Sequence, residues 1–203
     1  MNNYVAHTSS EVSWCEKNYE TSAHIVEYYN AISSLTILLA GIIGYVYVKK
    51  SATYMTLAFV GLSSFYFHAT LSLLGQLLDE LSISLLLMLV ILKMYNGANK
   101  LLYVIYLFFV IQIAIQIFYP FFNRFVLFAY AIPIFYKIKD LSTSKNYNAI
   151  TAVSTLFVIS VICWLFDFLC NDNINFLNVQ FHALWHCLVA VMAFFAIRLL
   201  ENK

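Results

Sequence analysis

Three histidines lie inside long apolar stretches of this 203-residue chain. His182 and His186 are four residues apart in FHALWHCLVAVMAFFAI, and His68 lies in FVGLSSFYFHATLSLL. Residues four apart lie on one face of a helix, so the pair can bind a single ion. Titratable groups inside membrane-length apolar segments are costly, and by default they mark a functional site. Because three imidazoles are a common catalytic zinc set, which leaves a fourth position for water, we interpret the three histidines as zinc ligands.

Interior packing and haem ligation are the two alternatives to a zinc site. A single histidine in an apolar helix is more often an interior side chain with its hydrogen bonds satisfied. Haem is also bound by histidine pairs in helical bundles. Haem needs axial ligands from opposite sides, however, whereas the spacing of His182 and His186 places both on one face. The pair therefore favours a small tetrahedral ion such as zinc.

Candidate catalytic groups lie near the histidines in the sequence. Asp79, in QLLDEL, could accept a proton from a metal-activated water and return it to a leaving amine. The adjacent Glu80 points about 100° away on a helix and is less favoured. Ser64 precedes His68 by four residues and so shares its helix face, where a hydroxyl could stabilise a developing oxyanion. We prefer it to Ser63, although either serine could simply be a small packing residue, which is common in membrane helices.

The composition indicates an all-α membrane protein. Hydrophobic residues make up 63% of the chain and charged residues 10%, whereas soluble domains carry about 25% charge. The apolar runs are continuous, as spanning helices require, and do not alternate as barrel strands do. A net charge of +1 leaves no basic surface for nucleic acid, so the lipid bilayer is the expected environment.

The chain holds seven apolar segments, and about 20 apolar residues in a helix are needed to cross a bilayer. We interpret residues 1–203 as one seven-transmembrane domain preceded by a polar N-terminal segment, 1–28. The predicted spans are approximately 29–48, 54–73, 77–92, 101–118, 121–136, 149–169 and 179–199. Gly75 is expected to break the chain between the second and third spans, and Pro133 lies inside the fifth, which is the weakest.

The distribution of lysine and arginine predicts the orientation, because cytosolic loops are enriched in both. One side of the predicted bundle carries two of these residues and the other side carries nine: Lys17 and Arg124 against Lys49, Lys50, Lys93, Lys100, Lys137, Lys139, Lys145, Arg198 and Lys203. The N-terminus is therefore predicted to be lumenal or outside, and the C-terminus cytosolic. In this arrangement His68, Asp79, His182 and His186 fall at similar depth near the lumenal face.

The N-terminal segment holds a second group of polar residues. Oxygen ligands at close spacing with a distal glutamate could coordinate calcium, although such an acidic segment is more commonly just solvated. The candidate calcium ligands are Ser13, Trp14, Glu16, Asn18 and Glu27. Cys15 and Cys170 both fall on the predicted lumenal side, where disulfides form. From their spacing alone, a bridge and two free thiols are both open.

Three segments, in order, resemble the signature segments of the alkaline ceramidases: SWCEKNYETSAHIVEYYNAIS, SSFYFHATLSLLGQLLDELSI and QFHALWH. These are seven-span hydrolases distantly similar to the adiponectin receptors. The resemblance covers the N-terminal segment, spans one to three and span seven, whereas residues 93–151 resemble nothing specific. It implies zinc held by His68, His182 and His186, and catalytic roles for Ser64 and Asp79.

The resemblance also implies a calcium site and a Cys15–Cys170 disulfide. The family uses an Asp-Trp-Cys-Glu-x-Asn run with a later glutamate, and here Ser13 replaces the aspartate. One charged ligand is thereby lost, so calcium should bind more weakly or not at all. Trp14 would contribute its backbone carbonyl, which the substitution does not affect.

These observations predict a zinc-dependent intramembrane amidase that cleaves ceramide into a fatty acid and a sphingoid base. The alternatives are a receptor-like or otherwise non-enzymatic zinc protein of the same superfamily, a related lipid amidase or phospholipase, or a small transporter that uses His and Asp as a proton relay. Inverted repeats would support a transporter, and none is visible in the sequence. The endoplasmic reticulum or the Golgi is the location that the resemblance implies. The sequence does not indicate the oligomeric state.

Overall fold

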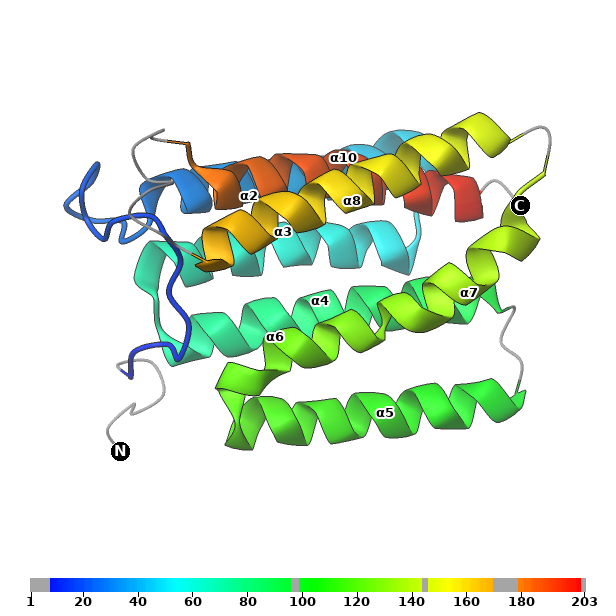
Figure 1. Cartoon of the computed structure of the whole chain (residues 1–203), viewed down its shortest axis with the longest axis horizontal. Helices are drawn as coiled ribbons and strands as arrows, with labels where there is room; N and C mark the ends of the chain where they lie inside the picture. The colour runs from blue at the N-terminus through cyan, green and yellow to red at the C-terminus, as the bar shows by residue number, and fades with distance from the viewer. Residues whose placement is uncertain (1–7, 96–98, 144–145, 170–178, 202–203) are drawn as a thin grey trace.

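The helices of this chain lie side by side in one bundle (Figure 1). A computed structural model describes residues 8–95, 99–143, 146–169 and 179–201. Within these ranges every regular element is helical, which confirms the all-α class. The elements are α2 (Tyr28–Ile43), a π-helical turn η1 (Gly44–Val48), α3 (Ala52–Thr70), α4 (Leu73–Met94), α5 (Asn99–Phe118), α6 (Pro120–Ala129), α7 (Ala131–Leu141), α8 (Tyr147–Leu169) and α10 (Phe181–Glu201).

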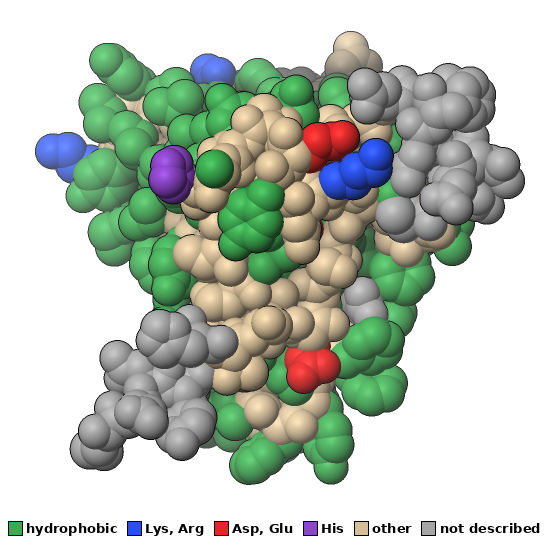
Figure 2. All heavy atoms as spheres, turned by 90° about the vertical axis from the view of Figure 1, so that its left-hand side faces the viewer, with side chains coloured by type: hydrophobic (Ala, Val, Ile, Leu, Met, Phe, Trp, Pro, Cys, Tyr) green, Lys and Arg blue, Asp and Glu red, His purple; other side chains and the backbone are tan. Residues whose placement is uncertain are grey.

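Among the described residues, four helical segments are long and apolar enough to cross a membrane, namely Tyr28–Val48, Pro120–Ile138, Tyr147–Leu169 and Phe181–Glu201. Figure 2 shows one end of the bundle, where polar groups and backbone occupy the centre and hydrophobic side chains gather around them. These features indicate a membrane protein. Helices α3 and α4 are less apolar because they carry buried polar residues, among them His68, Gln76, Asp79 and Glu80.

The break between α3 and α4 lies a few residues before the predicted one. Leu71 ends α3 in a left-handed conformation with φ of 42°, and Ser72 begins the next helix as its N-cap. The Ser72 hydroxyl accepts a hydrogen bond from the backbone N–H of Gly75 at 3.1 Å. Gly75 therefore lies in the first turn of α4. The capping serine, rather than the glycine, determines where the helix starts.

The fifth predicted segment, 121–136, consists of two helices in the structure. Helix α6 ends at Ala129 and α7 begins at Ala131. Pro133 has no N–H to donate to the carbonyl four residues earlier, which is that of Ala129, so a continuous helix is interrupted there.

Helices α2 and α3 approach closely because glycines lie between them. A Cβ atom at Gly41 would lie 2.2 Å from the backbone nitrogen of Ala58, and one at Gly61 would lie 2.1 Å from that of Leu38. Small residues of this kind let membrane helices pack backbone to backbone. The close contact places Ser34 of α2 against Ser64 of α3, with their hydroxyl oxygens 3.2 Å apart.

The opposite end of the bundle is held by a buried carboxylate. Glu201, the last residue of α10, forms ion pairs with Lys49 at 3.0 Å and with Lys93, and it accepts a hydrogen bond from Thr53 at 2.7 Å. Its side chain is almost fully buried. These contacts join the residue that follows η1 to α3, α4 and α10, and they lie at the end remote from the three histidines.

Candidate functional site

The three predicted zinc ligands meet at one end of the bundle. His68 lies in the last turn of α3, whereas His182 and His186 lie in the first two turns of α10. All three are almost completely buried, and one ring nitrogen of each lies within 4.8 Å of those of the other two. The ring centroids are 5.0, 5.1 and 4.6 Å apart. Residues far apart in the sequence therefore form one compact imidazole cluster.

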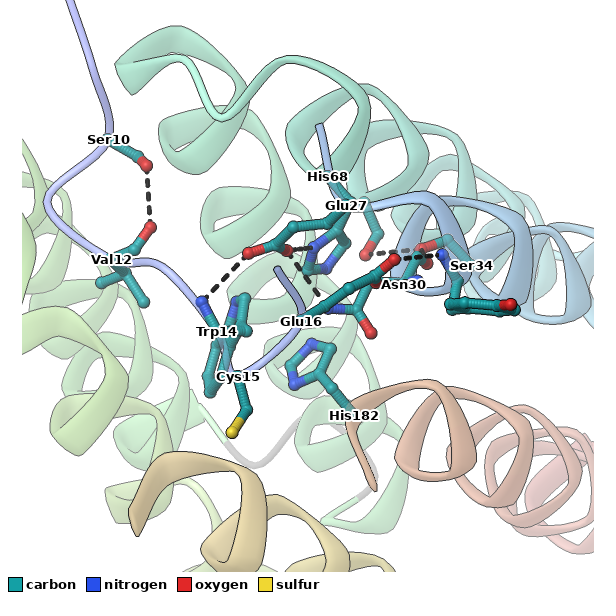
Figure 3. Close-up of polar contacts among 12 residues, drawn as sticks. Ser10, Val12, Trp14, Cys15, Glu16, Glu27, Asn30, Ser34, His68 and His182 are labelled. Carbon is teal, nitrogen blue, oxygen red and sulfur yellow. Dashed lines mark hydrogen bonds and ion pairs between the residues drawn. The ribbon is translucent and has the colours of Figure 1, made fainter. Parts of the chain in front are cut away.

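The Nδ1 atom of His68 is held by a carboxylate. Glu27, immediately before α2, has its Oε2 2.6 Å from this nitrogen (Figure 3). Burial alone would raise the pKa of Glu27, but the hydrogen bond and charge of His68, together with hydrogen bonds from Trp14 and Asn30, outweigh it, and the pKa lies below the usual value. An ionised carboxylate can only accept, so Nδ1 carries the proton. The Nε2 lone pair of His68 is then available for an ion.

A serine determines the tautomer of His186. The Ser33 hydroxyl donates to the backbone carbonyl of Asn30 at 3.0 Å and lies 2.8 Å from Nδ1 of His186. Because a hydroxyl has a single proton, the imidazole donates to the serine oxygen when that proton is donated to the Asn30 carbonyl. His186 Nε2 is thus left unprotonated inside the cluster, where it lies 3.4 Å from the Ser64 hydroxyl.

The cluster suits a small tetrahedral cation. The Nδ1 atom of His68 contacts Glu27 and that of His186 contacts Ser33, and the other ring nitrogen of each histidine is free for an ion. Metal-binding histidines generally have such an acceptor on the second nitrogen, which orients the ring. Bonds of about 2.0–2.1 Å to three imidazoles, with one open position, are typical of catalytic zinc. The residues present therefore fit zinc.

Ser64 and Asp79 lie beside the imidazole cluster. Ser64 is buried, within 3.4 Å of His186 Nε2 and 3.2 Å of the Ser34 hydroxyl, and its side chain interacts with the Asp79 carboxyl. One carboxyl oxygen of Asp79, Oδ1, is buried without a hydrogen-bond partner among the described residues. An unpaired buried acceptor is costly, so this oxygen is suited to receive a proton or a donor from a bound molecule.

The two less favoured candidates, Ser63 and Glu80, face other partners. Ser63 is hydrogen-bonded to Ser82 at 2.8 Å and to the carbonyls of Phe59 and Val60. Glu80 accepts a hydrogen bond from Gln76 at 3.0 Å. Ser64 and Asp79 therefore lie at the imidazole cluster, whereas Ser63 and Glu80 are hydrogen-bonded to other residues. Helix spacing in the sequence favours the same serine and the same acid.

The N-terminal segment packs over the histidine end of the bundle. The indole ring of Trp14 lies 4.0 Å from the ring of His182, and the backbone N–H of Trp14 donates to Oε1 of Glu27 at 3.0 Å. Both oxygens of Glu16 accept backbone N–H groups at the start of α2, from Tyr29 at 2.7 Å and from Asn30 at 2.9 Å. Burial raises the pKa of Glu16, and these two hydrogen bonds partly oppose that effect.

The five predicted calcium ligands differ in burial. Glu16 and Glu27 are buried and hydrogen-bonded to protein donors, whereas Ser13 and Asn18 are exposed. Calcium takes six to eight oxygen ligands, and its affinity depends on the number of charged ones. Only two of the five candidates, Glu16 and Glu27, carry a charge, so the donor set as it stands fits calcium poorly. The predicted disulfide involves Cys170, which lies outside the described residues, so the Cys15–Cys170 pairing stays a prediction.

Three side chains contribute to the site in ways that the sequence pattern did not predict. Glu27, a candidate calcium ligand by its spacing, supports His68. Ser33, which supports His186, has no distinguishing signal in the sequence. Asp167 lies 3.5 Å from His182, and its signal is that of an acid within the apolar run WLFDFL.

Comparison of the sequence with known proteins shows the family to which this chain belongs. The family model described as Ceramidase matches residues 6–202. The alkaline ceramidase of Drosophila melanogaster is 29% identical over 210 residues, covering 92% of this chain and 74% of the relative. Alkaline ceramidase 1 of Homo sapiens is 28% identical over 217 residues, covering 94% and 81%. Alkaline ceramidase 3 of Mus musculus is 27% identical over 221 residues, covering 93% and 81%. The chain belongs to the ceramidase family.

Proposed function

We propose that this chain hydrolyses the amide bond of ceramide, releasing a fatty acid and a sphingoid base, with zinc held by His68, His182 and His186. Family membership makes it an alkaline ceramidase-like hydrolase that acts on a linear amide C–N bond. The observation that carries the mechanism is the convergence of the three buried imidazoles beside Ser64 and Asp79. Ceramide stays in the bilayer, which suits a site built among membrane-length helices.

We also propose seven membrane spans with a lumenal N-terminus. Each predicted span overlaps a helix of the structure, with α6 and α7 together forming the fifth. Lys49 and Lys93 lie with Glu201 at the end remote from the histidines. The position of these two lysines supports a cytosolic C-terminal end, because positive residues concentrate on the cytosolic side. The resemblance supports the endoplasmic reticulum or Golgi membrane as the location, and a lumenal compartment would permit the Cys15–Cys170 bridge.

Ser64 and Asp79 have separate tasks in the proposed reaction. A bound zinc ion supplies Lewis acidity and lowers the pKa of water toward neutrality. The Ser64 hydroxyl donates a hydrogen bond to the amide oxygen as negative charge develops on it. Asp79 accepts a proton from the attacking water and delivers it to the leaving nitrogen. A C–O bond forms, the C–N bond breaks, and the products are a carboxylic acid and an amine.

The function is tested by fatty acid release from a ceramide panel. Purified wild-type chain in detergent or liposomes is incubated with ceramides of mixed chain length, and the fatty acid and sphingoid base are quantified. We expect equimolar products, loss of turnover after zinc chelation, and recovery when zinc is returned. Zinc-loaded protein that releases neither product would contradict the proposal.

Ser64 should be distinguishable from its neighbour. Replacing Ser64 with Ala removes the proposed oxyanion donor, and we expect kcat to fall by about 10²–10³, the typical effect of losing one such donor. Ser63→Ala is the matched control, because Ser63 is hydrogen-bonded to Ser82 and to backbone carbonyls instead. Zinc content should be unchanged in both. Equal losses of kcat in the two variants would remove the assigned role of Ser64.

Calcium binding should be gained by restoring the missing charge. We expect Ser13→Asp to tighten calcium binding by about tenfold or more, because ligand charge sets calcium affinity over orders of magnitude. The thermal midpoint of this variant should rise with millimolar calcium, whereas the wild-type midpoint should be insensitive to calcium chelation. Ser9→Asp, which adds the same charge at another exposed position, is the control. A wild-type chain that binds calcium as tightly as Ser13→Asp would refute this expectation.

A further inference from the structure

A buried carboxylate faces His182, the third histidine of the cluster. Asp167 lies near the end of α8, and its side chain is 5% exposed. Its Oδ2 lies 3.5 Å from Nδ1 of His182 and 3.4 Å from the backbone nitrogen of Cys15. Among the described residues, His182 Nδ1 has no hydrogen-bond partner, and the Asp167 carboxylate is the charged group beside it. A buried acid in an apolar helix is costly unless it is paired, and the groups that approach this one are the His182 ring and the Cys15 N–H.

The other two histidines show what such a contact does. Nδ1 of His68 faces Glu27, and Nδ1 of His186 faces Ser33. In each case a protein acceptor holds the proton on Nδ1 and leaves Nε2 free. We infer that Asp167 is a positioning residue that holds His182 in the same tautomer and fixes its ring for the ion. This inference rests on the proposed zinc site.

The N-terminal segment also contacts the carboxylates that face the histidines. Two consecutive backbone N–H groups donate to the two carboxylates, Trp14 to Glu27 and Cys15 to Asp167. Glu27 and Asp167 come from different parts of the chain and support histidines on different helices. The Trp14 ring also packs on His182, with centroids 4.0 Å apart (Figure 3). One short peptide stretch therefore orients both carboxylates, which couples docking of the N-terminal segment to the geometry of the imidazole cluster.

The test is zinc affinity measured separately from turnover. Asp167→Ala and Asp167→Asn are purified in full-length form, and zinc dissociation constants are obtained by competition with a chromogenic chelator. We expect Asp167→Ala to weaken zinc binding by about 10–100-fold, the usual effect of losing such a support. Asp167→Asn keeps the size and one acceptor oxygen, so it should lose less. Saturating zinc should restore part of the ceramide turnover of both variants.

A matched control separates positioning from packing. Ser160→Ala removes a buried hydroxyl from the same helix. In the described contacts, the Ser160 hydroxyl donates a hydrogen bond only to the backbone carbonyl of Phe157, one turn earlier in α8. This variant should leave zinc affinity at the wild-type value. The metal-free thermal midpoint is measured for every variant, and we expect that of Asp167→Asn to match the wild type. If Asp167→Ala binds zinc like the wild type, or lowers only the metal-free midpoint, the inference is overturned.

The failure of this inference differs from failure of the proposed function. Wild-type chain that binds zinc but releases no fatty acid would contradict ceramide hydrolysis, while the zinc affinities of the Asp167 variants would still test positioning. Conversely, normal zinc affinity and normal turnover in Asp167→Ala would refute the positioning role and leave the proposed function standing. Wild-type chain that binds no zinc would overturn both the metal assignment and the inference.

Discussion

Replacing His186 with Ala should abolish zinc binding and hydrolysis together. His186 is almost fully buried, its Nε2 faces the cluster, and its Nδ1 is fixed by Ser33. A bound metal contributes several kcal/mol to stabilising a hydrolytic transition state, and each 1.4 kcal/mol is about tenfold in rate, so the loss should be about 10³-fold or more. Zinc per chain and fatty acid release from ceramide are measured on the same preparation.

His24→Ala is the matched control for this experiment. His24 is exposed in the N-terminal segment and belongs to no cluster described above. The control should keep both zinc and turnover at wild-type values. Retention of turnover by zinc-free His186→Ala would mean that the reaction does not depend on the imidazole cluster, and the proposed mechanism would fail.

The Asp79→Asn variant is expected to retain zinc and lose turnover. The substitution keeps the size of the side chain but removes its ability to take a proton from water. General acid–base groups typically contribute 10²–10⁴-fold, so kcat should fall by about that amount. Because Asp79 is not among the three clustered ligands, zinc per chain should stay at the wild-type value.

Glu80→Gln provides the comparison for Asp79. The two acids are adjacent and equally buried, but Glu80 is hydrogen-bonded to Gln76, whereas Asp79 interacts with Ser64. A local packing or charge effect would act on both variants, whereas a proton-transfer role would affect only Asp79. A larger loss of kcat in Glu80→Gln than in Asp79→Asn would show that the proton transfer had been assigned to the wrong carboxylate.

Much of the site could be predicted because it depends on helix geometry. His182 and His186 share a face through their spacing, and the same rule selects Ser64 over Ser63 as the neighbour of His68. Counting the apolar segments also predicted that His68 lies near the end of one helix and that His182 and His186 lie near the start of another, as they do in α3 and α10. Local periodicity and segment order were sufficient for these predictions.

The supporting contacts could not be predicted in the same way. Glu27, Ser33 and Asp167 reach the histidines through the packing of α2 and α8 against α3 and α10, which periodicity does not encode. The approach of α2 to α3 depends on Gly41 and Gly61, whose role is visible only once the two helices are placed together. Long-range packing, not helix formation, determines these partners.

Two boundaries also depended on details of backbone chemistry. The turn after α3 is made by Leu71 in a left-handed conformation followed by the Ser72 cap, and a leucine in that conformation is not expected from its propensity. The division of α6 from α7 follows from Pro133, but its position relative to Ala129 had to be seen in the structure.

X-ray absorption at the zinc edge, recorded on purified wild-type chain and on His68→Ala, tests the central claim most directly. The wild-type spectrum should show one zinc per chain with three imidazole nitrogens and one oxygen at about 2.0–2.1 Å. Any zinc retained by His68→Ala should show two imidazoles. Identical spectra for the two proteins, or wild-type zinc bound by sulfur, would contradict a metal centre shared between α3 and α10.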